Sequence, residues 1–269
     1  MMYPRALLLL VAVAAGLGWG ILEAHAGDVL HGRVVRVLDG DTLILDGDRR
    51  VRLLDINTPE MGFDTGKREP MAQEATDALR RMVFGQWVTV QTSHQPKDAY
   101  GRWLGHVFWR TPDGRHAWAN GTLVRDGYAH VYTFADNALY APELGAYEAM
   151  AQANRRGLWA LPAWQVRAAA RCCAREDIGH FRLVEGTVRN TAHVRRAKGG
   201  RTYLNFGDDW KTDFTVMIAD SDRAWFKQAG IRDIENHYKG KRVRVHGILQ
   251  PVNGVQVRVT HPAQMAILD

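Results

Sequence analysis

The dipeptide Asp46-Gly47, with the strand-like segments on either side of it, constrains the fold of this chain more than any other feature. Asp-Gly is a strong signal for the tight I′ turn of a β-hairpin. Residues 34–45 before it and 48–54 after it are rich in the apolar and β-branched residues of strands. A two-residue loop here places Asp41 directly opposite Arg52. The sequence therefore predicts an antiparallel β core in the first half of the chain.

Alternation along this hairpin predicts which side chains share a face, because successive strand residues point to opposite sides. The predicted apolar face consists of Thr42, Ile44, Val51 and Leu53. The predicted charged face consists of Asp41, Arg50 and Arg52. An acidic and a basic side chain are therefore expected side by side, with the apolar core behind them.

The rest of the first half is predicted to contain two more strands and three helices. The strands are residues 87–92 and 105–110. Apolar residues at helical spacing predict one helix after Pro70, a short one that ends at Gly127, and a longer one over residues 144–158. This order predicts a mainly β domain with some α structure, a small antiparallel barrel with three helices.

The second half is predicted to form a separate module. Residues 161–180 are rich in Ala and Arg and predict a linker helix. Five strands are expected beyond it, at residues 183–188, 202–206, 214–218, 242–249 and 255–260. A helical segment at 221–230 lies between the third and the fourth strand, which is the element order of an OB barrel. The predicted domains are therefore 27–160 and 181–269.

The first 26 residues have the form of a signal peptide. A positive start is followed by an apolar run over residues 6–22 and by Ala24-His25-Ala26, the small-x-small form of a signal-peptidase site. Cleavage after Ala26 gives a secreted or periplasmic chain. An uncleaved N-terminal membrane anchor is the alternative, because the run approaches spanning length. No later segment is long and apolar enough to span a membrane, so no stable span is expected after cleavage.

Charge is unevenly distributed between the two halves. Residues 27–160 contain 16 Lys and Arg against 17 Asp and Glu, a net charge of −1. Residues 161–269 contain 18 against 11, a net charge of +7. A basic surface can bind phosphates without sequence preference, although a plain solvated surface gives the same count. The two cysteines, Cys172 and Cys173, are adjacent, which leaves a strained pair, free thiols or a cross-link to another chain.

Four short patches carry the candidate chemistry. They are Asp39-Gly40-Asp41-Thr42, Arg52, Asn57-Thr58-Pro59-Glu60 and Asp98-Ala99-Tyr100-Gly101-Arg102. Their carboxylates suit a hard cation and the activation of water, and their two arginines suit a phosphate group. Phosphodiester hydrolysis needs these functions in one place. Each patch alone is more often a plain turn, so only their combination indicates this chemistry.

In this order, with strands between them, the patches resemble the staphylococcal nuclease (thermonuclease) family over about residues 28–160. The resemblance implies an OB-fold barrel and a calcium-dependent nuclease that acts on DNA and RNA with water as nucleophile. Residues 203–207 with Asp213-Phe214 also resemble the C-terminal module of some exported nuclease-like proteins. The implied architecture is a nuclease barrel followed by a second, small OB-like barrel.

The resemblance implies a metal site at Asp41, Asn57 and Thr58, the last through its backbone carbonyl. Pro59 restricts Thr58 to extended backbone, which helps to orient that carbonyl. The family has an aspartate where this chain has Asn57, so one negative charge is missing. We therefore expect weaker Ca²⁺ binding or a shift to another divalent cation. Asp55 compensates only if the loop bends differently from the family.

Three catalytic residues are implied in the same way. Glu60 matches the carboxylate that takes a proton from the attacking water, a role that needs hydrogen-bond reach to that water. Arg52 and Arg102 match the family's two phosphate-binding arginines. Planar, permanently charged guanidinium groups bind phosphate oxygens in pairs and offset the charge that develops during hydrolysis.

Substrate contacts are expected from aromatic residues. Tyr100 is retained from the family pattern, while Ala99 replaces a basic residue that contacts a terminal phosphate. Tyr132 and Phe134 are candidates for a base-stacking surface, which tolerates any base. Their register is offset by one from the family's tyrosines, and a core role for one of them fits equally well.

The leading prediction is an exported, divalent-cation-dependent nuclease that hydrolyses DNA and RNA with little sequence specificity. The alternative is a nucleic-acid-binding protein or an envelope interaction module in which Asn57 has weakened catalysis. OB folds serve all of these purposes, so the fold alone does not choose between them. Metal-dependent cleavage of plasmid DNA distinguishes the first prediction from the others.

Overall fold

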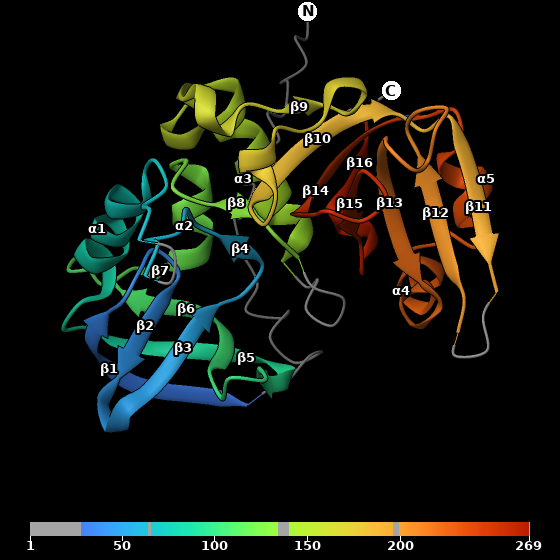
Figure 1. The fold of residues 1–269 in the computed structure, drawn as a ribbon. Helices are drawn as coiled ribbons and strands as arrows, with labels where there is room; N and C mark the ends of the chain where they lie inside the picture. The colour runs from blue at the N-terminus through green and yellow to red at the C-terminus, as the bar shows by residue number, and fades with distance from the viewer. Residues whose placement is uncertain (1–27, 64–65, 134–139, 196–198, 269) are drawn as a thin grey trace, which may run out of the picture.

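The computed structural model describes residues 28–63, 66–133, 140–195 and 199–268. The chain forms two β-rich bodies side by side, blue to green and orange to red in Figure 1. The predicted cleavage site after Ala26 lies outside the described residues. Within them, no helix has both the length and the apolar character that crossing a bilayer requires.

The first body is a closed barrel of five strands. These are β1 (Val29–Val37), β2 (Thr42–Leu45), β3 (Arg49–Leu53), β5 (Trp87–Lys97) and β6 (Trp103–Arg110). Their order is β3-β2-β1-β5-β6, and a parallel pairing of β3 with β6 closes the barrel. A short strand, β7 (His116–Trp118), extends the sheet beyond β6. The predicted barrel is confirmed.

Three helices accompany the barrel, as the periodicity predicts: α1 (Ala72–Val83), α2 (Ala119–Arg125) and α3 (Ala141–Ala153). The buried face of α1 includes Ala72, Ala75 and Leu79, which recur at helical spacing and are fully buried. Two further short strands, β4 (Ile56–Asn57) and β8 (His130–Val131), pair with each other outside the barrel sheet. This ribbon carries Asn57.

A turn interrupts the first predicted strand, so that prediction is wrong. β1 and β2 are separated by residues 38–41, and a 2.9 Å backbone hydrogen bond from Leu38 to the carbonyl of Thr42 closes the turn. A Cβ atom on Gly40 would lie 2.7 Å from Thr58 Oγ1. Glycine therefore lets the turn pack directly against the loop that carries Thr58.

The connection between β2 and β3 has three residues, one more than predicted. Asp46–Asp48 forms a 3-10 turn in which Gly47 and Asp48 have positive φ angles of 69° and 57°. Positive φ at two successive residues suits glycine and aspartate better than most residues. The register consequently places Thr42, not Asp41, opposite Arg52.

This shift of one residue corrects the predicted faces of β2. Thr42 and Ile44 share the face of the arginines, because Thr42 is opposite Arg52 and directly paired residues point the same way. Leu43 and Leu45 belong to the core and are fully buried. The predicted core positions on β3 were correct, but those on β2 were wrong.

The second body has the strand order of an OB barrel, as predicted. Its strands are β10 (Phe181–Thr187), β11 (Asn190–Val194), β12 (Arg201–Asn205), β13 (Phe214–Ala219), β14 (Arg242–Gln250) and β15 (Val255–Arg258). They lie in the order β11-β12-β13-β15-β14-β10. Two short helices, α4 (Arg223–Gln228) and α5 (Ile234–Tyr238), come between β13 and β14. Edge strands β9 (Arg167–Ala168) and β16 (Met265–Ile267) complete the sheet.

The segment between the two bodies is not the predicted linker helix. It consists of the 3-10 turns Pro162–Trp164, Ala169–Arg171 and Arg175–Asp177, with β9 among them. The buried Trp164 donates its indole N–H to the Pro70 carbonyl at 3.1 Å, so packing against the first body fixes this segment. Cys172 and Cys173 are joined to each other and pack at the edge of the second core.

Side chains on β14 of the second body make polar contacts with the first body. His246 Nδ1 lies 3.1 Å from the Val131 carbonyl, and its Nε2 lies 3.9 Å from Glu148. Arg244 donates to the Gln152 side chain at 2.7 Å. Glu148 is buried and accepts a 2.8 Å hydrogen bond from the Val131 N–H. The second barrel therefore packs directly on β8 and α3 of the first.

Candidate active site

The carboxylate of Asp41 lies at the centre of the predicted site. Asp41 ends the turn before β2, and only 5 % of the residue is exposed. Its Oδ2 accepts hydrogen bonds from the N–H and the Oγ1 of Thr58, each at 3.0 Å. The same oxygen forms an ion pair with the Arg52 guanidinium at 3.0 Å. The structure thus brings Asp41, Arg52 and Thr58 together although the predicted register was wrong.

Asn57 lies beside this group and holds it in place. Its Oδ1 accepts a 3.4 Å hydrogen bond from Arg52, and its Nδ2 donates to the Thr58 carbonyl at 3.3 Å. An aspartate at this position could not make the second bond, because a carboxylate only accepts. Asp55 does not compensate for the missing charge, since its buried carboxylate lies 3.2 Å from His106.

The donor set suits a hard dication. Burial and the neighbouring charge of Asp41 raise the pKa of Asp39 to about 7. Two acidic groups held together away from water fit a bound cation, which offsets both charges. Within the described residues, no three His, Cys, Asp or Glu side chains form a metal-binding group. A cation here therefore needs the neutral oxygens of Asn57 and Thr58 as well as the aspartates.

Glu60 lies within electrostatic reach of this cluster. The residue as a whole is exposed, but partial burial of its carboxyl and the charge of Asp41 raise its pKa, which Arg52 and Arg102 oppose. The charges of Asp41, Arg52 and Arg102 thus all influence the pKa of this one carboxyl. A carboxylate with a raised pKa is a stronger base, which suits the activation of water.

A second glutamate, Glu69, positions the backbone of Glu60. Glu69 Oε2 accepts a 2.8 Å hydrogen bond from the Glu60 N–H, and the Glu69 N–H donates to the Glu60 carbonyl at 2.9 Å. Between them the loop is tight, because a Cβ on Gly62 would lie 2.3 Å from the Lys67 carbonyl. These contacts join the two described ends of this loop, residues 60–63 and 66–69.

The second barrel holds Glu69 in turn. His180 Nδ1 lies 2.7 Å from Glu69 Oε1, and an Arg182 nitrogen lies 3.7 Å from the same oxygen. We call Glu69, His180 and Arg182 the loop clasp. The sequence did not predict this clasp, because His180 is 111 residues from Glu69 and no local pattern links them.

Arg102 is oriented by Asp98, four residues before it. Asp98 Oδ2 accepts a 2.7 Å bond from Arg102 Nε, and its Oδ1 accepts from the backbone N–H groups of Tyr100 and Arg102. Burial alone would raise the pKa of Asp98, but the hydrogen bonds from Arg102 outweigh it and lower the pKa. Tyr100 is 86 % exposed, and its ring centroid lies 5.5 Å from the Arg102 guanidinium carbon.

Of the two candidate stacking residues, Tyr132 can be placed and Phe134 lies outside the described residues. Tyr132 directly follows β8, and its N–H donates to the Asp55 carbonyl at 2.8 Å. Burial raises the pKa of its phenol, and Arg52 partly offsets this rise. Its ring packs edge-on against Phe181 of the second barrel, with centroids 5.1 Å apart. Tyr132 therefore lies between the site and the second barrel.

Comparisons with known proteins agree with this geometry. The family described as "Staphylococcal nuclease homologue" matches residues 50–161. An uncharacterized endonuclease of Escherichia coli O157:H7 is 37% identical over 153 residues, 54% of this chain and 88% of that protein. The micrococcal nuclease of Shigella flexneri is 36% identical over 164 residues, 58% of this chain and 88% of that protein.

A thermonuclease of Staphylococcus hyicus is 30% identical over 130 residues, 47% of this chain and 74% of that protein. The family match thus begins within β3 and ends at residue 161, and it includes the rest of the first body but not β1 and β2. The relatives agree with the cluster of acids and arginines in pointing to phosphodiester chemistry. The chain belongs to the staphylococcal nuclease family, and it is a nuclease of the hydrolase class.

Proposed function

We propose that this nuclease hydrolyses DNA and RNA with little sequence specificity, that it depends on a divalent cation, and that Ca²⁺ is the cation that serves best. The observation that supports this most directly is the cluster in which Asp41 Oδ2 accepts from Thr58 and pairs with Arg52, all at 3.0 Å, with Asn57 beside it. Low specificity is consistent with an exposed Tyr100, since stacking accepts any base.

In this proposal each side chain has one task. Glu60 accepts a proton from the attacking water, and Arg52 and Arg102 bind the phosphate oxygens and offset the charge that builds on them. Asp41, Asn57 and Thr58, with Asp39 behind them, hold the cation. The bound cation supplies Lewis-acid polarisation of the phosphate. Asp98 keeps the Arg102 guanidinium in place through their 2.7 Å hydrogen bond.

We also propose that the chain is exported by a signal peptide cleaved after Ala26, to the periplasm or the medium. The N-terminal sequence supports this, with a membrane anchor as the alternative. Residues 27–160 and 181–269 serve as the nuclease domain and the second domain. Two separate hydrophobic cores, one on each side of this division, support these boundaries. Mass spectrometry of the exported protein tests the cleavage site.

A nuclease assay tests the proposed function. Supercoiled plasmid and single-stranded RNA are incubated with the full chain in Ca²⁺, Mn²⁺, Mg²⁺ or chelator. We expect cleavage of both substrates in Ca²⁺ and none in chelator. Binding of polynucleotide without cleavage in any of the three ions would instead support the alternative of a catalytically weakened binding protein.

A further inference from the structure

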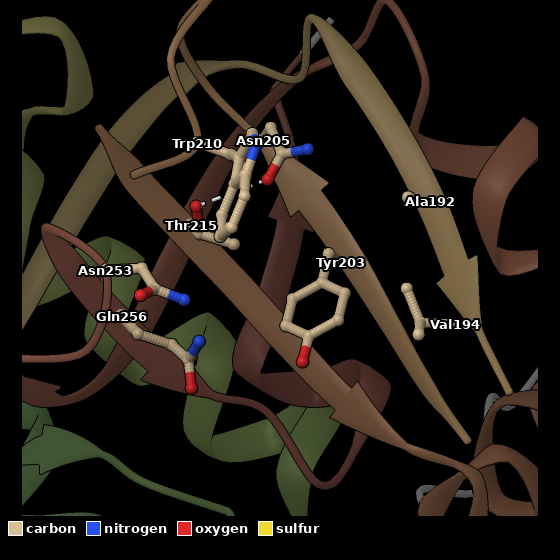
Figure 2. A pocket seen from close by; sticks show the side chains of 8 residues that line it. All are labelled: Ala192, Val194, Tyr203, Asn205, Trp210, Thr215, Asn253 and Gln256. Carbon is tan, nitrogen blue, oxygen red and sulfur yellow. Dashed lines mark hydrogen bonds between the residues drawn. The ribbon is translucent and has the colours of Figure 1, made fainter. Parts of the chain in front are cut away.

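The second barrel carries an open cavity of about 390 Å³ on its outer face, far from the chemistry of the first barrel in sequence. That volume lies within the range of ligand pockets. The cavity is lined by Ala192, Val194, Tyr203, Asn205, Trp210, Thr215, Asn253 and Gln256. Figure 2 shows Trp210 and Asn205 at one end, Tyr203 in the middle, and Asn253 with Gln256 along one side.

Strand register explains why these side chains gather. Tyr203 and Asn205 are two residues apart on β12 and so share one face of the sheet. Thr215 on β13 is opposite Asn205, and Gln256 on β15 is opposite Thr215. Trp210 comes from the β12–β13 connection and Asn253 from the β14–β15 connection. With Ala192 and Val194 of β11, four adjacent strands and two loops therefore build the cavity.

Gln256 and Asn205 place amide groups at the wall of the cavity. Only 6 % of the residue is exposed, and its carboxamide has no hydrogen-bond partner within the described part of the chain. In Figure 2 the carboxamide lies at the cavity wall. Asn205 Oδ1 accepts a 3.3 Å hydrogen bond from Thr215, which leaves the Asn205 NH₂ group to donate. Both amides can therefore donate to and accept from a polar ligand that enters the cavity.

Aromatic and basic side chains narrow the class of ligand. Trp210 is 53 % exposed at the cavity mouth, and the Lys211 ammonium lies 5.7 Å from its ring centroid. Arg201 shares the face of Tyr203, two residues before it on β12. Among the described residues, neither Arg201 nor Lys211 has an acidic partner for its side chain. Aromatic rings between unpaired cations suit a chain of bases and phosphates better than a neutral sugar.

We propose that this face binds a short unpaired stretch of polynucleotide. One base stacks on Trp210, the amides of Asn205 and Gln256 pair with the edge of a base, and Arg201 and Lys211 contact flanking phosphates. A base in a duplex has its pairing edge occupied, so the face selects single strands. This binding site extends the proposed function. Its assignment to polynucleotide rests on that function.

Binding in the presence of chelator tests this site without cleavage. A fluorescein-labelled 15-nucleotide oligothymidylate is titrated with the full chain, and anisotropy gives the dissociation constant. We expect Trp210→Ala to weaken binding roughly 5- to 100-fold, the range for loss of one stacked base. Trp210→Phe should keep most of the affinity, because a ring remains. Trp87→Ala is the matched control, since Trp87 is an exposed tryptophan, 68 % accessible, on the first barrel.

Two further measurements separate base from phosphate contacts. Gln256→Leu should reduce the differences in affinity among oligothymidylate, oligoadenylate and oligocytidylate, because it removes the group that reads the base edge. Lys211→Ala should weaken all three alike and lower the dependence of log affinity on log salt concentration by about 0.7, the value for one phosphate contact on a single strand.

Several outcomes overturn the proposal. Equal affinity of Trp210→Ala and Trp87→Ala would mean that no base stacks on Trp210. Competition by a neutral chitin oligosaccharide, with no effect of Lys211→Ala, would assign the cavity to a glycan. Failure of the proposed function is a separate result, because it appears as absence of metal-dependent plasmid cleavage and leaves the chelator titration unchanged.

Discussion

At the scale of single residues, turnover depends on the proton that Glu60 accepts. Glu60→Gln keeps the size of the side chain but cannot act as a base, so kcat should fall roughly 10²–10⁴-fold. Polynucleotide affinity should change little, because the arginines remain. Single-turnover cleavage with saturating enzyme measures the chemical step, and anisotropy measures binding. Unchanged turnover would show that another group activates the water.

The surroundings of Glu60 also set the acid limit of activity. Burial and the charge of Asp41 raise its pKa above 4.5, and a base works only when deprotonated, so cleavage is lost as pH falls through that raised pKa. Glu69→Gln removes one of the charges that raise it but keeps an oxygen for the Glu60 N–H. The acid limb of the kcat/KM profile should therefore move to lower pH. A limb that stays in place contradicts the assignment.

Asn57 makes the cation site less negative than an aspartate would. Asn57→Asp adds a negative charge to a site for a dication, so the Ca²⁺ concentration at half-maximal activity should fall. The variant loses the bond from Nδ2 to the Thr58 carbonyl, but that carbonyl is then free for the ion. Titration of activity with free Ca²⁺ in both proteins makes the comparison. A higher half-saturating concentration in the variant would place residue 57 outside the cation site.

At the scale of elements, the position of Glu69 depends on His180, just before β10, and on Arg182 within it. His180→Ala combined with Arg182→Ala removes both outer partners of Glu69, so the loop should loosen and kcat should fall by more than KM changes. His193→Ala is the matched control, since His193 lies 2.9 Å from Asp220 within the second barrel. If the two proteins have the same kcat, the loop clasp does not position Glu60.

The order of helices and strands along the chain was largely predictable from the sequence. The turns and the strand register were predicted less well. The three helices of the first barrel and most strands follow from periodicity and turn residues, which are local signals, but β11 was not predicted. The turn at Asp39-Gly40-Asp41 was missed because the apolar residues around it continue the strand pattern. The hairpin register was missed because Asp48 adopts positive φ, which adds a third residue to the connection. The acids and arginines were still found, because they lie in short sequence motifs that can be recognised without the strand register.

At the scale of the whole molecule, the buried contact between the barrels makes stability depend on pH. Burial lowers the pKa of His130 below 6.5 although Glu148 opposes this, so the folded chain resists protonation where the unfolded chain accepts it. Stability is therefore lost as pH falls below 6.5, by up to about 1.4 kcal/mol per pH unit for one proton. His130→Gln should make this dependence shallower, as urea unfolding at pH 7.5 and 5.5 measures. Equal slopes in both proteins would exclude His130 as the source.

The joint between the barrels was beyond sequence prediction. It consists of contacts between residues far apart in the chain, such as His246 with Val131, which are separated by 115 positions. A helical linker was expected from Ala and Arg content, but the buried Trp164 instead ties that segment to the Pro70 carbonyl of the first body. Composition predicts local conformation. It does not predict which distant residues a tryptophan will contact in the folded chain.

The loop clasp also affects the point during synthesis at which the enzyme gains full nuclease activity. The N-terminal half of a chain leaves the ribosome first and generally folds first. A nascent chain that ends before residue 180 has all the described acids and arginines of the site, but its Glu69 lacks the clasp partners. We expect such a chain to cut slowly. Late synthesis of the second barrel would then delay full activity until the chain is almost complete.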